Sequence, residues 1–397
     1  MANTILTPTA VTRKALMILH QKLQFIGSIN RQYDSSFAKS GAKIGDSLKI
    51  RLPNEYVVRN GATLSTQDTA ETSTTLQVAT QKGVDLNFTS TDLTLSLDDF
   101  SSRILEPAMS VLAANIEADA LTMRNDVYQI VDGDAAAISF KHLMQAEQAL
   151  TDALAPPDNN RNIILSTDHN VTLVDALKGL FNDTTTIGKQ YRDGMMGRTA
   201  GMDFYRSTQM TDKLTGTSAK TTGYVVNGAG QSGAALTVGT GATTFLAGDI
   251  ITIAGVYRVH PETKAISSKL QTFVVTANSG VSATSLSISP PLVISGARQN
   301  VSGSPATSAA IVKVGAGASE SLSGSLAFHR DAFTFATADL VMPSGVDFSS
   351  REVFDGISMR VVRQYDINND KFPCRLDVMY GFKTIRPQLA CRIHADG

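Results

Sequence analysis

Cysteine, tryptophan and charge are scarce in this sequence. Its 397 residues contain two cysteines, Cys374 and Cys391, and no tryptophan. Two cysteines cannot build a disulfide framework for a chain of this length, and the sequence has neither a Cys-x-x-Cys pair nor a His-x-x-x-His pair. We therefore expect free thiols in a reducing compartment and no structural zinc. Only 18% of the residues are charged, whereas globular domains typically carry about 25%.

Long hydrophobic runs are missing too. The longest apolar stretches, such as 15–19 and 250–256, are far shorter than the roughly 20 residues of a membrane-spanning helix. Arg13 and Lys14 precede the first stretch as in a signal peptide, but His20 ends it at once. These absences predict a soluble chain without an export signal.

The chain has no excess of either charge, since 35 basic and 36 acidic residues leave a net charge of −1 at pH 7. This balance excludes the strong positive field with which a non-specific nucleic-acid binder neutralises phosphates. The first 60 residues are the exception, with nine basic and three acidic residues. A helix from about Thr9 would align Leu16, Leu19, Leu23 and Ile26 in one stripe. We predict an amphipathic arm packed on a neighbouring surface; an arm that binds anions or a membrane surface is the alternative.

Serine, threonine, glycine and alanine replace charge in three segments, 61–94, 211–244 and 277–325. Such weakly charged surface is typical of chains that pack on other chains, and flexible linkers have a similar composition. Composition alone leaves both interpretations open. The length is consistent with two or three domains, each large enough to bury a core.

The N-terminal part predicts a hairpin followed by a long helix. Alternating apolar residues over 43–53 predict one arm of the hairpin, with 60–71 as its tip or return and strands near 76–79 and 86–88.

The strongest helix signal covers 96–131. Ser96 and Asp99 resemble a capping box, and apolar residues then recur at spacings of four and three. Pro107 is expected to kink this helix or to divide it in two. Because charge pairs at coiled-coil positions are not sustained, we predict a spine that runs across a flat domain.

The remaining chain predicts an α/β domain interrupted by a β domain. A helix over 139–154, a buried strand over 162–165 and a helix from 167 to 181 indicate the α/β part. Over 223–314 the helical signal vanishes, and about five short strands predict a small barrel or sandwich. These strands cover 224–226, 235–238, 249–254, 270–276 and 285–294. The C-terminal strands, expected to close onto the spine helix, cover 327–336, 359–365, 374–382 and 389–393.

Two motifs resemble ligand sites but fail on their context. Residues 228–233 match the dinucleotide fingerprint G-x-G-x-x-G, yet no helical pattern follows, and Asp249, the nearest acid at the required distance, sits in a Gly-Asp turn. We predict a flexible β-turn there.

Residues 366–377 begin like a calcium loop, but Lys371 replaces the required glycine and Asp377 replaces the bidentate glutamate. Here we predict a hairpin turn between the flanking strands.

No catalytic arrangement is recognisable. The six histidines are scattered, and no Gly-x-Ser-x-Gly elbow exists. We predict no catalytic, cofactor-binding or metal-binding residues and no enzyme activity, although residues distant in sequence can converge in a fold. The histidines are His20, His142, His169, His260, His329 and His394.

Five regions of the chain, taken in order, carry a resemblance to a known family. They are GDSLKIRLP at 45–53, AANIEAD at 113–119, YRDG and AGMD within 191–203, AGDIITIAGV at 247–256, and RLDVMYGF followed by Arg-Pro within 375–387. Together they resemble the major capsid proteins of tailed bacteriophages with the Hong Kong 97-type fold. The closest resemblance is to the coat-protein family of the short-tailed Salmonella phage, which has an inserted β domain.

The resemblance implies an α+β fold with an inserted small antiparallel β-barrel. Its parts would be an N-terminal arm at 1–40, an extended β-hairpin loop at 41–75, a peripheral domain with the spine helix at 76–136 and 346–397, an axial domain at 137–222 and 315–345, and the inserted barrel at 223–314. The family's arm and extended loop lie on neighbouring subunits.

The implied function is that of a major capsid protein, which self-assembles into pentamers and hexamers of an icosahedral head enclosing double-stranded DNA. The expected partners are copies of the chain, a separate scaffolding protein and a portal protein, without sequence-specific DNA binding, cofactor or membrane. The scaffold is expected to be another chain because the arm passes directly into the strand at Lys43. We expect the protein in the virion capsid after assembly in the host bacterial cytoplasm. The alternative is a β-rich phage tail, decoration or adhesin-like module whose 223–314 segment binds a ligand.

Overall fold

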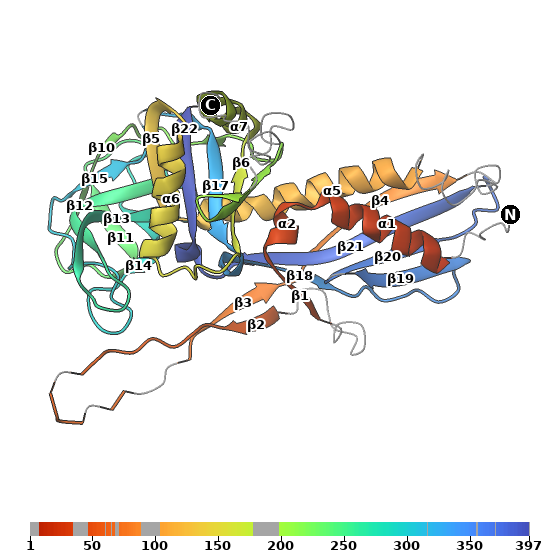
Figure 1. Ribbon diagram of the computed structural model, residues 1–397, viewed down its shortest axis with the longest axis horizontal. Coiled ribbons are helices and arrows are strands. Elements are labelled where there is room, and N and C mark those ends of the chain that lie inside the picture. The colour runs from red at the N-terminus through yellow and green to blue at the C-terminus, as the bar shows by residue number, and fades with distance from the viewer. Residues whose placement is uncertain are drawn as a thin grey trace. The chain divides into compact units, whose positions relative to one another are not determined.

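The computed structural model (Figure 1) contains two compact units, each assembled from segments that are distant in sequence. Unit 1 comprises Met1–Arg51, Ser73–Thr122 and Phe333–Ile385; unit 2 comprises Leu52–Thr72, Met123–Ala332 and Arg386–Gly397. The structure describes residues 8–34, 47–59, 61–64, 66–67, 71–88, 104–177, 198–315, 317–354, 356–369 and 371–396. No helix within these ranges is long and apolar enough to cross a membrane.

In the described part of unit 1, six strands form one sheet around the long strand β21, which pairs with β18, β20 and β4. Strand β1 adds to the edge in parallel with β18, and β19 extends the other edge from β20. All six residues of β18 are buried. The strands are β1 Asn30–Asp34, β4 Thr80–Phe88, β18 Phe333–Ala338, β19 Phe348–Phe354, β20 Ile357–Arg363 and β21 Phe372–Thr384.

The predicted N-terminal helix is confirmed as α1, Pro8–Lys22, with the short α2, Phe25–Ser28, after it. The predicted apolar stripe is buried: Leu16, Leu19 and Ile26 have no exposed surface. However, α1 packs on β19 and β20 and against the spine helix of its own unit (Figure 1). The surface on which this predicted amphipathic arm packs therefore belongs to the same chain.

The spine helix is α5, Glu106–Leu121, and a 3-10 turn over Thr122–Asp126 follows it. Met109, Leu112 and Ile116 bury its apolar face. The predicted end at 131 is wrong, since β5 begins at Ile130. Pro107 stands in the first turn of α5, where a proline lacks no hydrogen bond that the helix would otherwise make. The predicted capping box at Ser96 lies outside the described residues.

Unit 2 contains a six-stranded mixed sheet in the order β5-β22-β17-β6-β8-β7, counted over its described residues. The predicted helix at 139–154 is confirmed as α6, Phe140–Asp152, which packs on β5, β22 and β17. The predicted strand at 162–165 is confirmed as well, as the fully buried β6. The helix α7 covers Thr167–Leu177. The strands are β5 Ile130–Ala137, β6 Arg161–Leu165, β7 Arg198–Thr199, β8 Met202–Arg206, β17 Gly324–His329 and β22 Ala390–Asp396.

Two predictions for the C-terminal strands are corrected here. The single strand predicted over 327–336 is two strands, β17 and β18, which belong to different sheets and are separated by a 3-10 turn at Arg330–Ala332. The last strand, β22, pairs with β5 and β17 in unit 2 instead of closing onto the spine helix. Unit 2 therefore includes residues 123–136 and 386–397, which the division implied by the resemblance assigns to the peripheral domain.

The predicted inserted β domain is a closed barrel in the order β10-β11-β14-β13-β12-β15. Sequence periodicity identifies about five strands; the sixth is the short β15, which closes the barrel by pairing with both β10 and β12. Tyr224, Phe245 and Phe273 are the largest side chains of its core. The strands are β10 Thr221–Val226, β11 Gly233–Gly239, β12 Ile250–Val259, β13 Ile266–Val275, β14 Ser285–Leu292 and β15 Ala310–Lys313.

Both rejected ligand motifs are turns, as predicted. Residues 228–233 connect β10 to the antiparallel β11, and no helix follows them. The 366–371 segment connects β20 to β21, and the Asp366 carboxylate accepts hydrogen bonds from Asn368 N (3.0 Å) and Asn369 Nδ2 (2.8 Å). Asp377 lies in β21 and pairs with Arg360 at 2.6 Å.

Candidate functional site

No group of three or more metal-ligating side chains occurs within the described ranges. Burial raises the pKa of the Cys374 and Cys391 thiols to about 12, so neither is a ready nucleophile. His169 is a buried core residue whose ring nitrogens bond to Ser325 Oγ (2.7 Å) and the Ala395 carbonyl (3.0 Å). The remaining candidates are exposed surfaces and buried polar clusters.

The first candidate surface is the extended loop, which joins the paired strands β2, Ser47–Arg51, and β3, Ser73–Gln77. This confirms the predicted hairpin arm. Beyond the pair, Leu52 N still donates to Thr72 O at 2.8 Å. Farther out, Gln67 closes the loop, because its Oε1 accepts from Val57 N at 2.8 Å and its Nε2 donates to the Val57 carbonyl.

Apolar side chains are exposed along this loop. Val58 is 85% exposed and Leu64 79%, and Tyr56 and Val57 are exposed as well. The charged Arg59 turns back on the loop and donates to the carbonyls of Gly61 and, at 3.2 Å, Thr63. Exposed apolar residues grouped in this way mark a surface that another chain can cover. The weakly charged composition of the segment is thus explained here better by contact with another chain than by a linker role.

In unit 1 the buried Glu117 of the spine helix holds the N-terminal arm. Its carboxylate accepts hydrogen bonds from the backbone amides of Gln24 (3.1 Å) and Phe25 (2.9 Å) at the start of α2. Burial raises the pKa of Glu117, and the two amide hydrogen bonds oppose that rise. No local sequence pattern reveals this contact, because its partners are separated by more than 90 residues.

In unit 2 a second buried carboxylate, Asp249, fastens the barrel to its connecting segments. It accepts hydrogen bonds from Lys213 Nζ (3.0 Å), Gly216 N (3.0 Å) and Leu246 N (2.9 Å). The buried Lys313 donates to Thr215 Oγ1 at 2.9 Å. Desolvation lowers the pKa of Lys213, and the charge of Asp249 opposes this. We call Lys213, Thr215, Asp249 and Lys313 the barrel junction.

The barrel junction lies where the chain enters and leaves the inserted barrel. The chain enters the barrel after β9, Lys213–Leu214, and leaves it before β16, Ser321–Leu322, and these two strands pair. Gly248 permits the tight turn before Asp249, since its φ is +90° and a Cβ there would lie 2.6 Å from Lys213 Cε. The sequence reveals this Gly-Asp turn but not that its carboxylate is buried.

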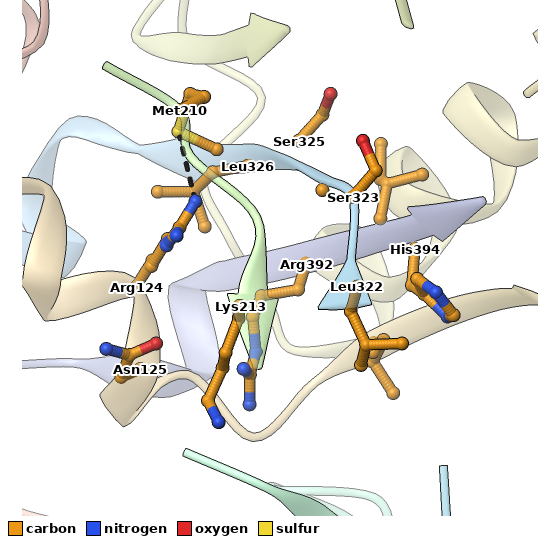
Figure 2. Close-up of a pocket in the computed structure, with 13 residues that line it drawn as sticks. Arg124, Asn125, Met210, Lys213, Leu322, Ser323, Ser325, Leu326, Arg392 and His394 are labelled. Atoms are coloured by element: carbon orange, nitrogen blue, oxygen red, sulfur yellow. Dashed lines mark hydrogen bonds between the residues drawn. The ribbon is translucent and has the colours of Figure 1, made fainter. Parts of the chain in front are cut away.

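A pocket lies beside the barrel junction (Figure 2). It has a volume of about 40 Å³, and its basic lining residues are Arg124, Lys213 and Arg392, with His394 beside them. Arg124 donates to the Thr211 carbonyl and to Thr211 Oγ1 at 3.4 Å. Figure 2 shows Lys213 and Arg392 side by side, coming from β9 and β22.

Comparison with protein families gives one match that covers nearly the whole chain. Residues 30–392 match the model of the P22 coat protein, gene protein 5. No curated protein sequence matches the chain.

Several solved structures are similar over most of the chain. The structure titled Mycobacterium phage Che8 has 13% identity and a TM-score of 0.47, over 94% of this chain and 90% of the other. The mature capsid of bacteriophage PhiM1 has 10% identity and a TM-score of 0.45, over 92% and 85%. The capsid of Ralstonia phage GP4 has 8% identity and a TM-score of 0.43, over 95% and 92%. These identities and scores are low, so the family match carries the assignment.

Proposed function

Because the chain belongs to the P22 coat protein family and is a major capsid protein, we propose that its copies form the pentamers and hexamers of an icosahedral phage head that encloses double-stranded DNA. The observation that carries the proposal is the match of the family model to residues 30–392. The mechanism is assembly: head-to-tail contacts close into rings, and further contacts between rings close the shell.

The exposed residues of the extended loop support a direct role for this loop in the contacts between copies. Its exposed residues Tyr56, Val58 and Leu64 lack cover within the described chain, and burying them against a neighbouring copy would stabilise the shell. Each such contact is modest, but many of them act together in a closed shell.

We propose that the loop, the peripheral and axial parts and the barrel divide this work. The loop at 41–75 contacts neighbouring copies, and the peripheral and axial parts keep their shape in both ring types. The barrel at 223–314 stabilises the chain or its neighbours. The net charge of −1 supports a shell that encloses DNA without gripping it or reading its sequence.

The remaining partners are proposals from the family as well. A separate scaffolding protein would guide procapsid assembly in the host cytoplasm, and a portal protein would occupy one vertex. No cofactor or catalytic step is needed, because assembly requires only non-covalent contacts.

Electron microscopy of the purified, overexpressed chain tests the proposal. We expect closed shells or polyheads, with or without a co-expressed scaffold. Persistent monomers under all these conditions, together with ligand binding by the 223–314 barrel, would instead support a tail, decoration or adhesin-like module.

A further inference from the structure

The pocket beside the barrel junction contains a guanidinium, that of Arg392, with two buried nitrogens that lack a hydrogen-bond partner among the described residues. The Nε and Nη2 atoms of Arg392 are buried and have no hydrogen-bond acceptor within the described part of the chain. Burial, and next the charge of Arg124, lower the pKa of Arg392 to about 10. Burying charged donors without an acceptor is costly, so these two nitrogens favour the binding of an acceptor at this place.

The pocket lining offers no carboxylate that could supply this acceptor. Among its described residues, Arg124, Lys213 and Arg392 are basic, and none is acidic. The nearby Asp249 is occupied by Lys213 and two backbone amides. Asp126 and Asp249 attract Arg392 only from outside the lining.

The pocket also contains a serine hydroxyl that could bind the same ligand as Arg392. Ser323 Oγ lines the same pocket, is buried and has no hydrogen-bond partner among the described residues. Asn125 Oδ1 is also unpartnered there, and rotation of its amide would present Nδ2 as a further donor. Figure 2 shows Ser323, Arg392 and Asn125 around the same space.

We propose that this pocket binds one small oxyanion, either a phosphate or a carboxylate group, between the Arg392 guanidinium and the Ser323 hydroxyl. A guanidinium donates to two oxygens of such a group at once. The volume of about 40 Å³ is enough for a few waters or one small oxyanion. Because the pocket adjoins the barrel junction, the anion would tighten the attachment of the barrel.

Titration of the purified full-length chain with inorganic phosphate and with acetate tests this site. We expect a saturable rise of the thermal midpoint of unfolding, by about 3 °C at ten times the dissociation constant. Sodium chloride at the same ionic strength should not reproduce it. A response to phosphate alone identifies a phosphate site, and a response to both identifies a site that also accepts a carboxylate, such as a side chain of a second copy.

Two substitutions in the pocket and one control test whether the anion acts at this site. Arg392→Gln should abolish the response and raise the midpoint in anion-free buffer, because it removes an unpaired buried charge. Ser323→Ala, which should fold normally, is expected to weaken anion binding several-fold. Arg206→Gln, at an exposed arginine of the same unit, is the matched control and should respond like the wild type. The proposal fails if neither anion gives a saturable response, or if Ser323→Ala and Arg392→Gln respond like the control.

Discussion

The contact between Glu117 and the start of α2 joins two distant segments through two hydrogen bonds. Glu117→Ala would leave the amides of Gln24 and Phe25 unpaired in a buried place. We expect the free energy of unfolding to fall by about 1–3 kcal/mol, measured by chemical denaturation. Glu106→Ala, at an exposed position of the same helix, is the control and should change it by less than about 0.5 kcal/mol. Equal effects of the two substitutions would contradict the anchoring role.

The same carboxylate predicts a pH dependence. Burial raises the pKa of Glu117 in the folded chain, whereas an unfolded glutamate titrates near about 4.3. The folded state therefore binds this proton more tightly, and its contribution to stability is present below about pH 4.3 and lost as the pH rises through the raised pKa. Relative to Glu117→Gln, the wild type should lose stability across that window. A difference that stays constant with pH would show that Glu117 does not titrate in this way.

Gly248 is a second residue on which a junction depends. Gly248→Ala would strain a φ of +90° and push a Cβ against Lys213, so the pair with Asp249 should be disturbed. We expect a loss of more than about 1 kcal/mol of unfolding free energy. Gly280→Ala, where a Cβ meets nothing within 4 Å, is the matched control. A thermal melt in which both variants match the wild type would contradict the prediction.

At the residue scale, features set by local sequence are predictable, and features set by contacts between distant segments are not. The apolar stripe of α1 and the two false ligand motifs are predictable, since spacing and turn residues act locally. Glu117, Asp249 and Arg392 are functional candidates only because distant segments bury them, and no local pattern distinguishes a buried carboxylate or guanidinium from a solvated one.

At the scale of elements, the structure changes the role that is expected of the N-terminal arm. If the arm lay on neighbouring subunits, as the family resemblance implies, a chain lacking residues 1–40 would fold as a monomer and assemble poorly. In the structure α1 packs on β19, β20 and α5, and β1 pairs with β18. The arm is therefore part of the core of unit 1, and we now expect the truncated chain to lose cooperative unfolding of this unit.

A point substitution tests this more sharply than the deletion. Leu16→Ala empties a fully buried position on α1 and should lower the free energy of unfolding by about 2–5 kcal/mol. Met17→Ala, next to it but 41% exposed, should have an effect within about 0.5 kcal/mol. Denaturation followed by far-UV circular dichroism gives both values. Two near-neutral results would mean that α1 does not contribute to the core.

Sequence patterns predict these elements better than their ends. Helices α1 and α6 and most barrel strands are predictable because their apolar periodicity is regular. The end of the spine helix is not, since the apolar spacing continues through Val127 and Ile130 although the chain has entered the other unit. The break between β17 and β18 is hidden for the same reason: both strands are apolar, and only their pairing partners separate them.

At the scale of the whole molecule, the scarcity of charge is connected with assembly. A chain with 18% charged residues has fewer groups to desolvate when its surfaces meet other copies. The structure shows two different uses of such segments. The barrel strands bury their apolar residues in a core of their own, whereas the extended loop leaves its apolar residues exposed.

A substitution in the extended loop should affect assembly of the shell without affecting folding of the chain. Val58→Asp places a charge on a side chain that is 85% exposed, so the thermal midpoint of the dissociated chain should stay unchanged. If another copy covers Val58, the same charge would be desolvated in the shell and should block assembly. Sedimentation and electron microscopy would then show monomers in place of closed particles. Val281→Asp, at a 69% exposed position of the barrel, is the control; shells that form equally well from both variants would exclude the loop from the contacts between copies.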